Sequence, residues 1–487
     1  MTLVTPKAHL RYGDKVLDEG SGGFFDHRHP FTQQVQARIP LAGAKEVDEA
    51  VELADSVAGE WRRWSPEARR NVLNKLADLL LEHRQEFAEL AALDGGTPTS
   101  YGLGGVDNAV NWTRYYAGWC DKLSGELLST LDTRGQFAYT APEPYGVVGI
   151  IITWNGPLIS LGMKVAPALA AGNCVVVKPS EFTPFAPDLF ARLVREAGIP
   201  DGVCSILSGG MEAGEALVAH PKVKKISFTG GPVAARHIMR SCAELLKPAV
   251  LELGGKSAAL VFPDGGDLDM LAARALRWSI GVFAGQGCVL PTRLLVHEDI
   301  YDDLLDKLVE QVRGYKVGDP FDPEVTVGPL INAAAVERVC GMLDRARSEG
   351  AGRIVFGGGR PGGELADKNF VEPTIIADAD PEHEIAQVEI FGPVLLVMKF
   401  STEDEAVELA NATPYGLGAF IHSTDLTRVH RLAERLNAGG IYVNGAKPNL
   451  PHTPFGGLGL SGFGKEGGRA GIDEFVHYKT VSIVENI

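Results

Sequence analysis

Apolar and polar positions follow two alternating patterns through the middle of the chain. Short runs rich in β-branched residues predict buried strands, and segments with apolar residues three or four positions apart predict helices between them. The predicted strands are residues 147–152, 174–177, 203–207, 225–228 and 249–253. The first predicted helix ends near residue 171, and the later ones span 186–197, 212–219 and 232–245. This alternation predicts a parallel, doubly wound sheet that binds ligands at the carboxyl ends of its strands.

The flanking segments follow other patterns. Residues 1–42 are expected to be extended, a long helix should begin at Ser65-Pro66, and residues 105–122 should be helical. Residues 125–142 alternate weakly, as in an exposed pair of strands. A second α/β region is predicted after residue 288. Its strands lie near 294–297, 353–356, 394–400, 418–421 and 441–443, and its helices near 302–314, 334–347, 402–410 and 426–437.

Composition narrows the class of protein. A chain of 487 residues can hold two or three domains, and its net charge of 46 − 62 = −16 argues against nucleic-acid or acidic-membrane partners. The longest apolar run is too short to cross a bilayer, and the N-terminus lacks the apolar core of a signal peptide. Six cysteines without metal-ligand spacing predict reduced thiols, no metal site and a cytoplasmic location.

The stretch 251–288 carries the chemistry. It opens with Glu252 before Gly254-Gly255 and closes with Cys288 after a second glycine-rich turn, with a strand-like run at 258–262 and a helical pattern at 268–278 between them. We expect the chain to fold back and bring the two ends together. A carboxylate that takes a proton from water, facing a nucleophilic thiol, suits covalent acyl-enzyme chemistry. For most Cys/Glu pairs, a buried cysteine and a surface glutamate is the better interpretation.

Two strand ends favour a dinucleotide. Lys178 and Glu181 follow one strand, where a lysine and a carboxylate can hold the ribose hydroxyls of an adenosine. Gly230 and Gly231 follow another, where glycines let the backbone approach a diphosphate and Pro232 begins a helix. The alternatives are a solvated lysine and an ordinary βα turn.

Other glycine-rich motifs are rejected. The GxGxxG matches at 357–362 and 457–462 lack the strand–turn–helix context that a dinucleotide site needs. The sequence Gly255-Lys256-Ser257 is not a phosphate-binding P-loop, because Val250 replaces its leading glycine.

A further candidate follows the first buried strand. The side-chain amide of Asn155, in Thr153-Trp154-Asn155, can donate to a developing oxyanion. The alternative is a loop asparagine that caps the next helix.

Together these segments resemble the NAD(P)-dependent aldehyde dehydrogenase superfamily, in order and approximate spacing through nearly the whole chain. The matching positions are Asn155, Lys164, Lys178, Glu181, Gly230, Glu252, Cys288, Glu389, Phe391, Asn444 and 454–457. The resemblance implies a Rossmann-type cofactor domain (1–124 and 145–254), an α/β catalytic domain (255–453) and a small β oligomerisation flap (125–144 with 454–487). It also implies assembly as a homodimer or homotetramer.

The resemblance implies a role for each matching residue. Cys288 attacks a small-molecule aldehyde, Asn155 and the Cys288 backbone N–H hold the oxyanion, Glu252 activates water, and Lys164 joins the catalytic set. Glu389 holds the nicotinamide ribose and Phe391 packs nearby. The remaining cofactor-binding positions are Lys178, Glu181, Thr153, Trp154, Gly230 and Gly231. A carboxylate at Glu181 repels a 2′-phosphate, which favours NAD over NADP.

Departures from the family pattern bear on the substrate. Thr153, Gly156, Phe283 and Gly231 stand where relatives commonly have other residues. Gly156 should widen the substrate tunnel. No arginine lies in the segments that we assign to the tunnel, and Lys447 is the one cation expected near its mouth. We therefore expect medium or bulky apolar or aromatic aldehydes to be preferred over acetaldehyde and over semialdehydes that bear a carboxylate.

Two alternative functions stay open. A CoA-acylating enzyme would replace water by a thiol, but the presence of Glu252 favours hydrolysis. A non-enzymatic binding protein on this fold predicts the loss of Cys288 or Glu252, and both are present.

Overall fold

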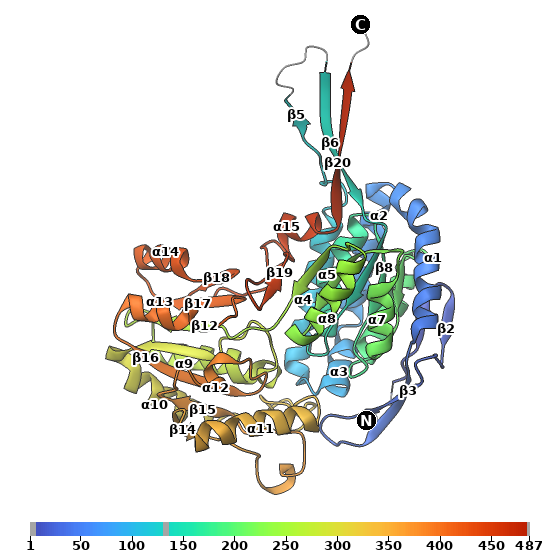
Figure 1. Ribbon diagram of the computed structural model, residues 1–487. Helices are drawn as coiled ribbons and strands as arrows, with labels where there is room; N and C mark the ends of the chain where they lie inside the picture. Colours follow the sequence, from blue (N-terminus) through green and yellow to red (C-terminus); the bar gives the residue numbers. More distant parts are fainter. Residues whose placement is uncertain (1–5, 130–135, 485–487) are drawn as a thin grey trace.

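A computed structural model describes residues 6–129 and 136–484 of the chain (Figure 1). Its largest sheet has eight strands in the order β19-β11-β10-β7-β8-β9-β1-β2. The five inner strands are parallel: β7 (Val147–Ile151), β8 (Cys174–Lys178), β9 (Cys204–Ile206), β10 (Val223–Thr229) and β11 (Ala249–Glu252). The outer ones are β1 (Leu10–Tyr12), β2 (Lys15–Leu17) and β19 (Gly462–Phe463). The parallel, doubly wound sheet is confirmed.

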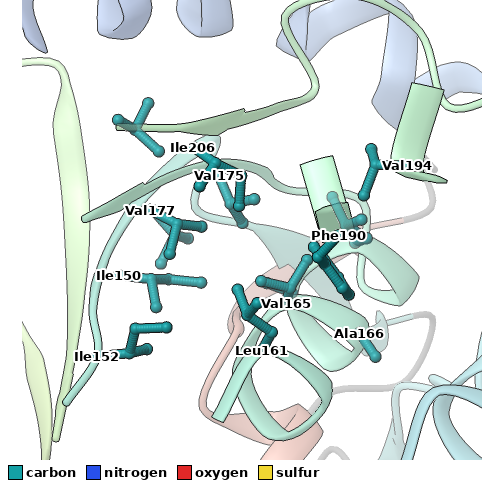
Figure 2. Packing of buried hydrophobic residues seen from close by; sticks show 14 of the residues in the cluster. Ile150, Ile152, Leu161, Val165, Ala166, Val175, Val177, Phe190, Val194 and Ile206 are labelled. Carbon is teal, nitrogen blue, oxygen red and sulfur yellow. The ribbon is translucent and has the colours of Figure 1, made fainter. Parts of the chain in front are cut away.

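Helices pack on both faces of this sheet. One face is covered by α1 (Ala44–Arg63), α7 (Met211–Ala219) and α8 (Pro232–Glu244), and the other by α5 (Pro157–Ala170) and α6 (Phe185–Glu196). Three further helices pack against α5 and α6: α2 (Pro66–Glu82), α3 (Arg84–Gly95) and α4 (Thr99–Ala117). Figure 2 shows the core between the strands and α5 and α6, where Ile150, Val177, Leu161, Val165 and Phe190 are buried.

Local sequence explains the helix boundaries. The side chain of Ser65 accepts a hydrogen bond from the Ala68 N–H, so α2 begins where predicted. The helix predicted at 105–122 instead spans Thr99–Ala117. Its first turns contain Gly102, Gly104 and Gly105, which weaken the helical pattern. Gly102 allows a close approach to α3, because a Cβ would lie only 3.0 Å from the Cα of Ala88.

A second sheet has seven strands in the order β14-β15-β16-β13-β12-β17-β18. Its strands are β12 (Ala258–Val261), β13 (Arg293–His297), β14 (Arg353–Phe356), β15 (Thr374–Ala377), β16 (Val394–Phe400), β17 (Gly418–His422) and β18 (Gly440–Val443). Its helices are α9 (Leu268–Leu276), α10 (Tyr301–Val312), α11 (Ala333–Ser348), α12 (Glu384–Gln387), α13 (Glu403–Asn411) and α14 (Leu426–Arg435). Sequence analysis did not predict β15, because four residues after Pro373 are too short for a clear pattern.

The third sheet projects from the body of the molecule (Figure 1). It has the order β20-β6-β5, formed by β20 (Val476–Val484), β6 (Gln136–Pro144) and β5 (Leu127–Leu128). The expected strand pair at 125–142 is therefore confirmed except at 130–135, which lie outside the described residues. A hairpin, β3 (Phe24–Arg28) with β4 (Val35–Pro40), forms the fourth sheet. Between β19 and β20 lies α15 (Gly468–Asp473).

Two hydrophobic clusters follow the two large sheets, one from Ala8 to Val476 and one from Ala258 to Leu436. The domain boundaries given above stay a prediction. Among the described residues, no helix is long and apolar enough to cross a membrane.

Candidate active site

The site forms where the turn after β11 meets the loop that carries Cys288. A Cβ on Gly255 would lie 2.4 Å from the Cys288 carbonyl oxygen, and one on Gly254 would lie 2.2 Å from a Glu389 carboxylate oxygen. Only glycine allows three chain segments to approach this closely. The structure thus brings together the two ends of the stretch 251–288, with Glu252 as the last residue of β11.

The loop before Cys288 is held in an unusual conformation. Phe283 and Ala284 have a φ of 52° and Gly285 has a φ of 73°, all in the left-handed region. The buried Gln286 side chain holds this loop, because it donates to the Phe283 carbonyl (3.0 Å) and accepts from the Ile331 N–H (3.1 Å). Sequence analysis missed Gln286, although a polar side chain beside two glycines was a signal.

A cavity of about 350 Å³ contains both Cys288 and Glu252 in its wall. Asn155 also lines it, and its Nδ2 donates to the Gln286 carbonyl at 2.8 Å. An amide nitrogen carries two hydrogens, so the second remains for a substrate oxygen. Most of the other wall is apolar: Tyr101, Ile159, Met163, Trp278, Val282, Phe283, Val289, Leu290, Leu450 and Phe455.

The cavity is open beside its glycines. A Cβ on Gly104 would meet nothing within 4 Å, and one on Gly156 would meet only Ile159, at 3.7 Å. The φ of Gly156 is −170°, which lies outside the left-handed region that favours glycine. The space that the sequence predicted at Gly156 is present.

Glu252 is buried, and neither of its carboxylate oxygens has a hydrogen-bond partner in the described chain. Burial raises the pKa of this carboxyl well above its usual range, the nearby Glu466 raises it further, and Lys164 and Lys465 oppose the shift. A carboxylate with a raised pKa is a stronger base, which suits proton transfer from water.

The electrostatic surroundings of Cys288 favour the protonated thiol. Burial raises its pKa to about 12, and the carboxylates of Glu389 and Glu252 add to the shift. The backbone N–H groups of Cys288 and Val289 act in the opposite direction. In this state of the enzyme, the thiol is therefore neutral at physiological pH.

Lys164 lies on α5 and forms a buried ion pair with Glu466. Its Nζ also donates to the Ser227 hydroxyl at 3.0 Å. Sequence analysis missed Glu466. The signal was indirect, because a lysine in the apolar helix of 161–170 needs a buried partner for its charge.

The cofactor candidates lie at one edge of the first sheet. Lys178 ends β8 and its Nζ donates to the Gly209 carbonyl at 2.7 Å, with Glu181 three residues further on. Gly230 follows β10, and Gly231 precedes α8. Because parallel strands end at the same edge, these groups share it with the segment after β7.

That segment also contacts the second sheet. Trp154 follows Thr153, shortly after the end of β7. Its ring meets the ring of Phe391 edge to face, with centroids 5.4 Å apart. Glu389 accepts a hydrogen bond from the Gly255 N–H at 3.1 Å, and burial raises its pKa to about 7. Glu389 and Phe391 therefore lie beside both the cofactor edge and the Cys288 loop.

These groups fit a nicotinamide dinucleotide. No side chain caps the N-terminus of α8, and a Cβ on Gly231 would meet nothing within 4 Å, so a diphosphate can reach the first-turn N–H groups. Lys178 and Glu181 offer a donor and an acceptor for ribose hydroxyls.

One expectation is wrong: an arginine does line the tunnel. Arg277 shares the wall of the cavity with Cys288. The predicted helix at 268–278 ends at Leu276, and a π-helical turn, η1 (Arg277–Gly281), follows it. That turn contributes Arg277 and Trp278 to the cavity wall.

Comparison with known proteins agrees with this geometry. The model of the aldehyde dehydrogenase family matches residues 17–481. Pea (Pisum sativum) aminoaldehyde dehydrogenase 1, peroxisomal, is 39% identical, covering 93% of this chain and 91% of the relative. The NADP/NAD-dependent aldehyde dehydrogenase PuuC of Escherichia coli is 38% identical over 94% of this chain and 92% of its own. The NAD+ complex of an aldehyde dehydrogenase from Bacillus cereus superposes with a TM-score of 0.95 and 35% identity, covering 99% and 98% of the two chains.

The chain belongs to the aldehyde dehydrogenase family. It is an oxidoreductase that acts on aldehydes with a nicotinamide cofactor.

The buried pair predicts a double-mutant result. Lys164→Met or Glu466→Leu alone should destabilise the protein by about 3–5 kcal/mol, because each leaves one buried charge unpaired, while the double variant should recover most of the loss. Thermal melting followed by circular dichroism measures this. Lys222→Met, which breaks exposed pairs with Glu52 and Asp55, is the control and should cost ~1 kcal/mol or less. Single variants no less stable than this control would contradict the account.

Proposed function

We propose that this enzyme oxidises an aldehyde to a carboxylic acid with NAD, through a thioester on Cys288. The observation that carries the proposal is the shared cavity, which Cys288, Glu252 and Asn155 line together. A nucleophile, a base and an amide donor around one space are what acyl transfer requires.

Each residue has one task in the reaction. The Cys288 thiol gives its proton to a water molecule, and the sulfur attacks the aldehyde carbon as the C=O π bond breaks. The new oxyanion accepts hydrogen bonds from the Asn155 amide and the Cys288 backbone N–H. The bound cofactor supplies the acceptor for the hydride. Glu252 then takes a proton from water, the water oxygen attacks the thioester carbon, and the C–S bond breaks to release the acid and the thiol.

We propose NAD as the preferred cofactor. The Glu181 carboxylate at the end of β8 would repel a 2′-phosphate and accept from ribose hydroxyls. Lys178, Gly230, Gly231, Thr153 and Trp154 supply the rest of the adenosine and diphosphate contacts, and Glu389 and Phe391 those at the nicotinamide. The Bacillus cereus relative binds NAD+, whereas PuuC is described as NADP/NAD-dependent.

We propose a medium or bulky substrate, because the cavity wall is largely apolar and open beside Gly104 and Gly156. Hydrolysis is favoured over acylation of CoA because Glu252 is present and lies in the same cavity as the thiol.

We also propose a homodimer or homotetramer built on the projecting sheet. Its described residues include exposed large side chains that a partner would cover: Leu127, Phe137, Tyr478, Ile483 and Val484. The six free cysteines favour a reducing compartment, the cytosol.

Replacement of the base should separate the two half-reactions. In Glu252→Gln, we expect a burst of one reduced cofactor per site and then slow turnover, because the thioester forms but water is not activated. Stopped-flow absorbance of the reduced cofactor measures this. The control Glu244→Gln on the surface of α8 should turn over normally. Full steady-state activity of Glu252→Gln would exclude this role, and a wild-type requirement for CoA would favour acylation.

Cofactor choice should depend on one carboxylate. In Glu181→Ser, the ratio of kcat/KM for NADP to that for NAD should rise by roughly tenfold or more, because the repulsion of the 2′-phosphate is removed. Initial rates with each cofactor give the ratio. Glu196→Ser, at the exposed end of α6, serves as the control. An unchanged ratio would exclude Glu181 as the selecting group.

A further inference from the structure

Two cationic side chains line the same cavity as the catalytic thiol. Arg277 comes from the turn η1, and Lys447 comes from the loop that follows β18. They are the only arginine and lysine among the described residues of the cavity wall. The wall between them and Cys288 includes Trp278 and Phe283.

Neither cation has a carboxylate partner in the part of the chain that the structure describes. Several other arginines in the molecule are ion-paired, such as Arg84 with Asp107 and Arg428 with Asp264. Arg277 instead lies over the ring of Tyr101, with its guanidinium carbon 5.8 Å from the ring centroid. This contact leaves the planar N–H groups of the guanidinium free for another acceptor.

The surroundings of Arg277 hold it beside the cavity. Tyr101 and Tyr315 flank it, and its charge lowers the pKa of both phenols, although their burial raises that pKa more strongly. A Cβ on Gly281 would lie 2.9 Å from the Tyr101 hydroxyl, so η1 packs directly against this ring. The guanidinium is therefore supported by packing rather than by an ion pair.

Lys447 lies on a loop of restricted conformation. Asn444, Gly445 and Asn449 all have positive φ values, and the buried Pro448 follows Lys447 directly. Proline fixes its own φ and restricts the residue before it. The loop thus brings Lys447, an exposed side chain, to the wall of the same cavity as Arg277.

The carboxylates of the cavity do not neutralise these cations. Glu466 is paired with Lys164, and Glu252 is buried with a raised pKa. The whole chain carries a net charge of −16, so its general field repels anions. Both cations are solvent-exposed at the wall of the cavity, so a negatively charged ligand that enters it meets two positive charges without a competing ion pair among the described residues.

We propose that the substrate is an aldehyde whose apolar body carries a carboxylate, which Arg277 binds with its planar N–H groups and Lys447 attracts. The guanidinium fork matches the two oxygens of a carboxylate. The same cations should disfavour positively charged aldehydes. A protonated aminoaldehyde, the class of substrate in the name of the pea relative, would therefore be a poor substrate for this chain. This inference rests on the proposed role of Cys288 as the nucleophile.

The test uses two probes of one shape and different charge. They are 4-carboxybenzaldehyde and its neutral methyl ester, methyl 4-formylbenzoate. Wild type should oxidise 4-carboxybenzaldehyde with a kcat/KM about tenfold or more above that for the methyl ester. The difference should arise mainly from a lower KM, because the carboxylate makes a charge-assisted contact. In Arg277→Gln the two values should become equal within about twofold.

Matched variants complete the kinetic test. Lys447→Gln should reduce the ratio by a smaller factor, because a flexible ammonium gives no bidentate contact. Arg63→Gln removes the same charge from the exposed end of α1 and should leave the ratio unchanged. Equal use of both probes by wild type, or a ratio that survives in Arg277→Gln, would overturn the proposal.

A binding experiment separates this proposal from the chemistry of oxidation. In Cys288→Ala, quenching of tryptophan fluorescence reports ligand binding beside Trp278, which lies in the cavity wall. Here 4-methylbenzoate should bind about tenfold tighter than 4-methylbenzamide, and Arg277→Gln should remove the difference. Failure of oxidation with this preference intact would count against the proposed reaction alone. Equal binding of the two ligands would overturn the carboxylate site, whatever the enzyme oxidises.

Discussion

The close approach of the turn after β11 to the loop of Cys288 is the contact on which the site depends. Gly254 leaves room for Glu389 and Gly255 for the Cys288 carbonyl, so a side chain at either position would push the second sheet from the first. The same turn connects β11 to β12 and therefore joins the two large sheets. It places Glu252, the proposed base, at the end of one sheet. Cys288, the proposed nucleophile, lies opposite on a loop that precedes β13 of the other sheet.

This contact concentrates charge in a poorly hydrated space. Glu252, Glu389 and Glu466 lie around the thiol, and Lys164 pairs with one of them. Burial and carboxylates both raise the pKa of Cys288, which keeps the thiol neutral and poorly reactive before catalysis. The raised pKa of Glu252 makes its ionised form a stronger base, which suits its proposed role in hydrolysis. Burial thus raises the pKa of both the proposed nucleophile and the proposed base.

Sequence analysis was most successful where the pattern was local. The strands around the cofactor edge, the α2 cap at Ser65 and the chemistry-bearing motifs were readable because each depends on neighbouring residues. Proximity of Glu252 and Cys288 was expected, but the partner of Lys164 was not, since Glu466 lies 302 residues further along the chain. Arg277 was missed because a π-helical turn changes which side chains face the cavity, and nothing in the residue pattern marked that change. The place of Arg277 in the cavity wall could therefore be found only from the three-dimensional structure.

The reactivity of the thiol tests this account most directly. Alkylation of Cys288 by iodoacetamide, in enzyme without added cofactor, can be followed by mass spectrometry of its peptide from pH 7 to pH 10. The rate should rise about tenfold per pH unit without a plateau, because only the thiolate reacts and its pKa lies near 12. Glu389→Gln should increase the rate above pH 7, where its carboxylate is ionised, whereas Glu384→Gln at an exposed ion pair should not. A plateau near pH 8, or no effect of Glu389→Gln, would contradict the claim that burial and carboxylates restrain the nucleophile.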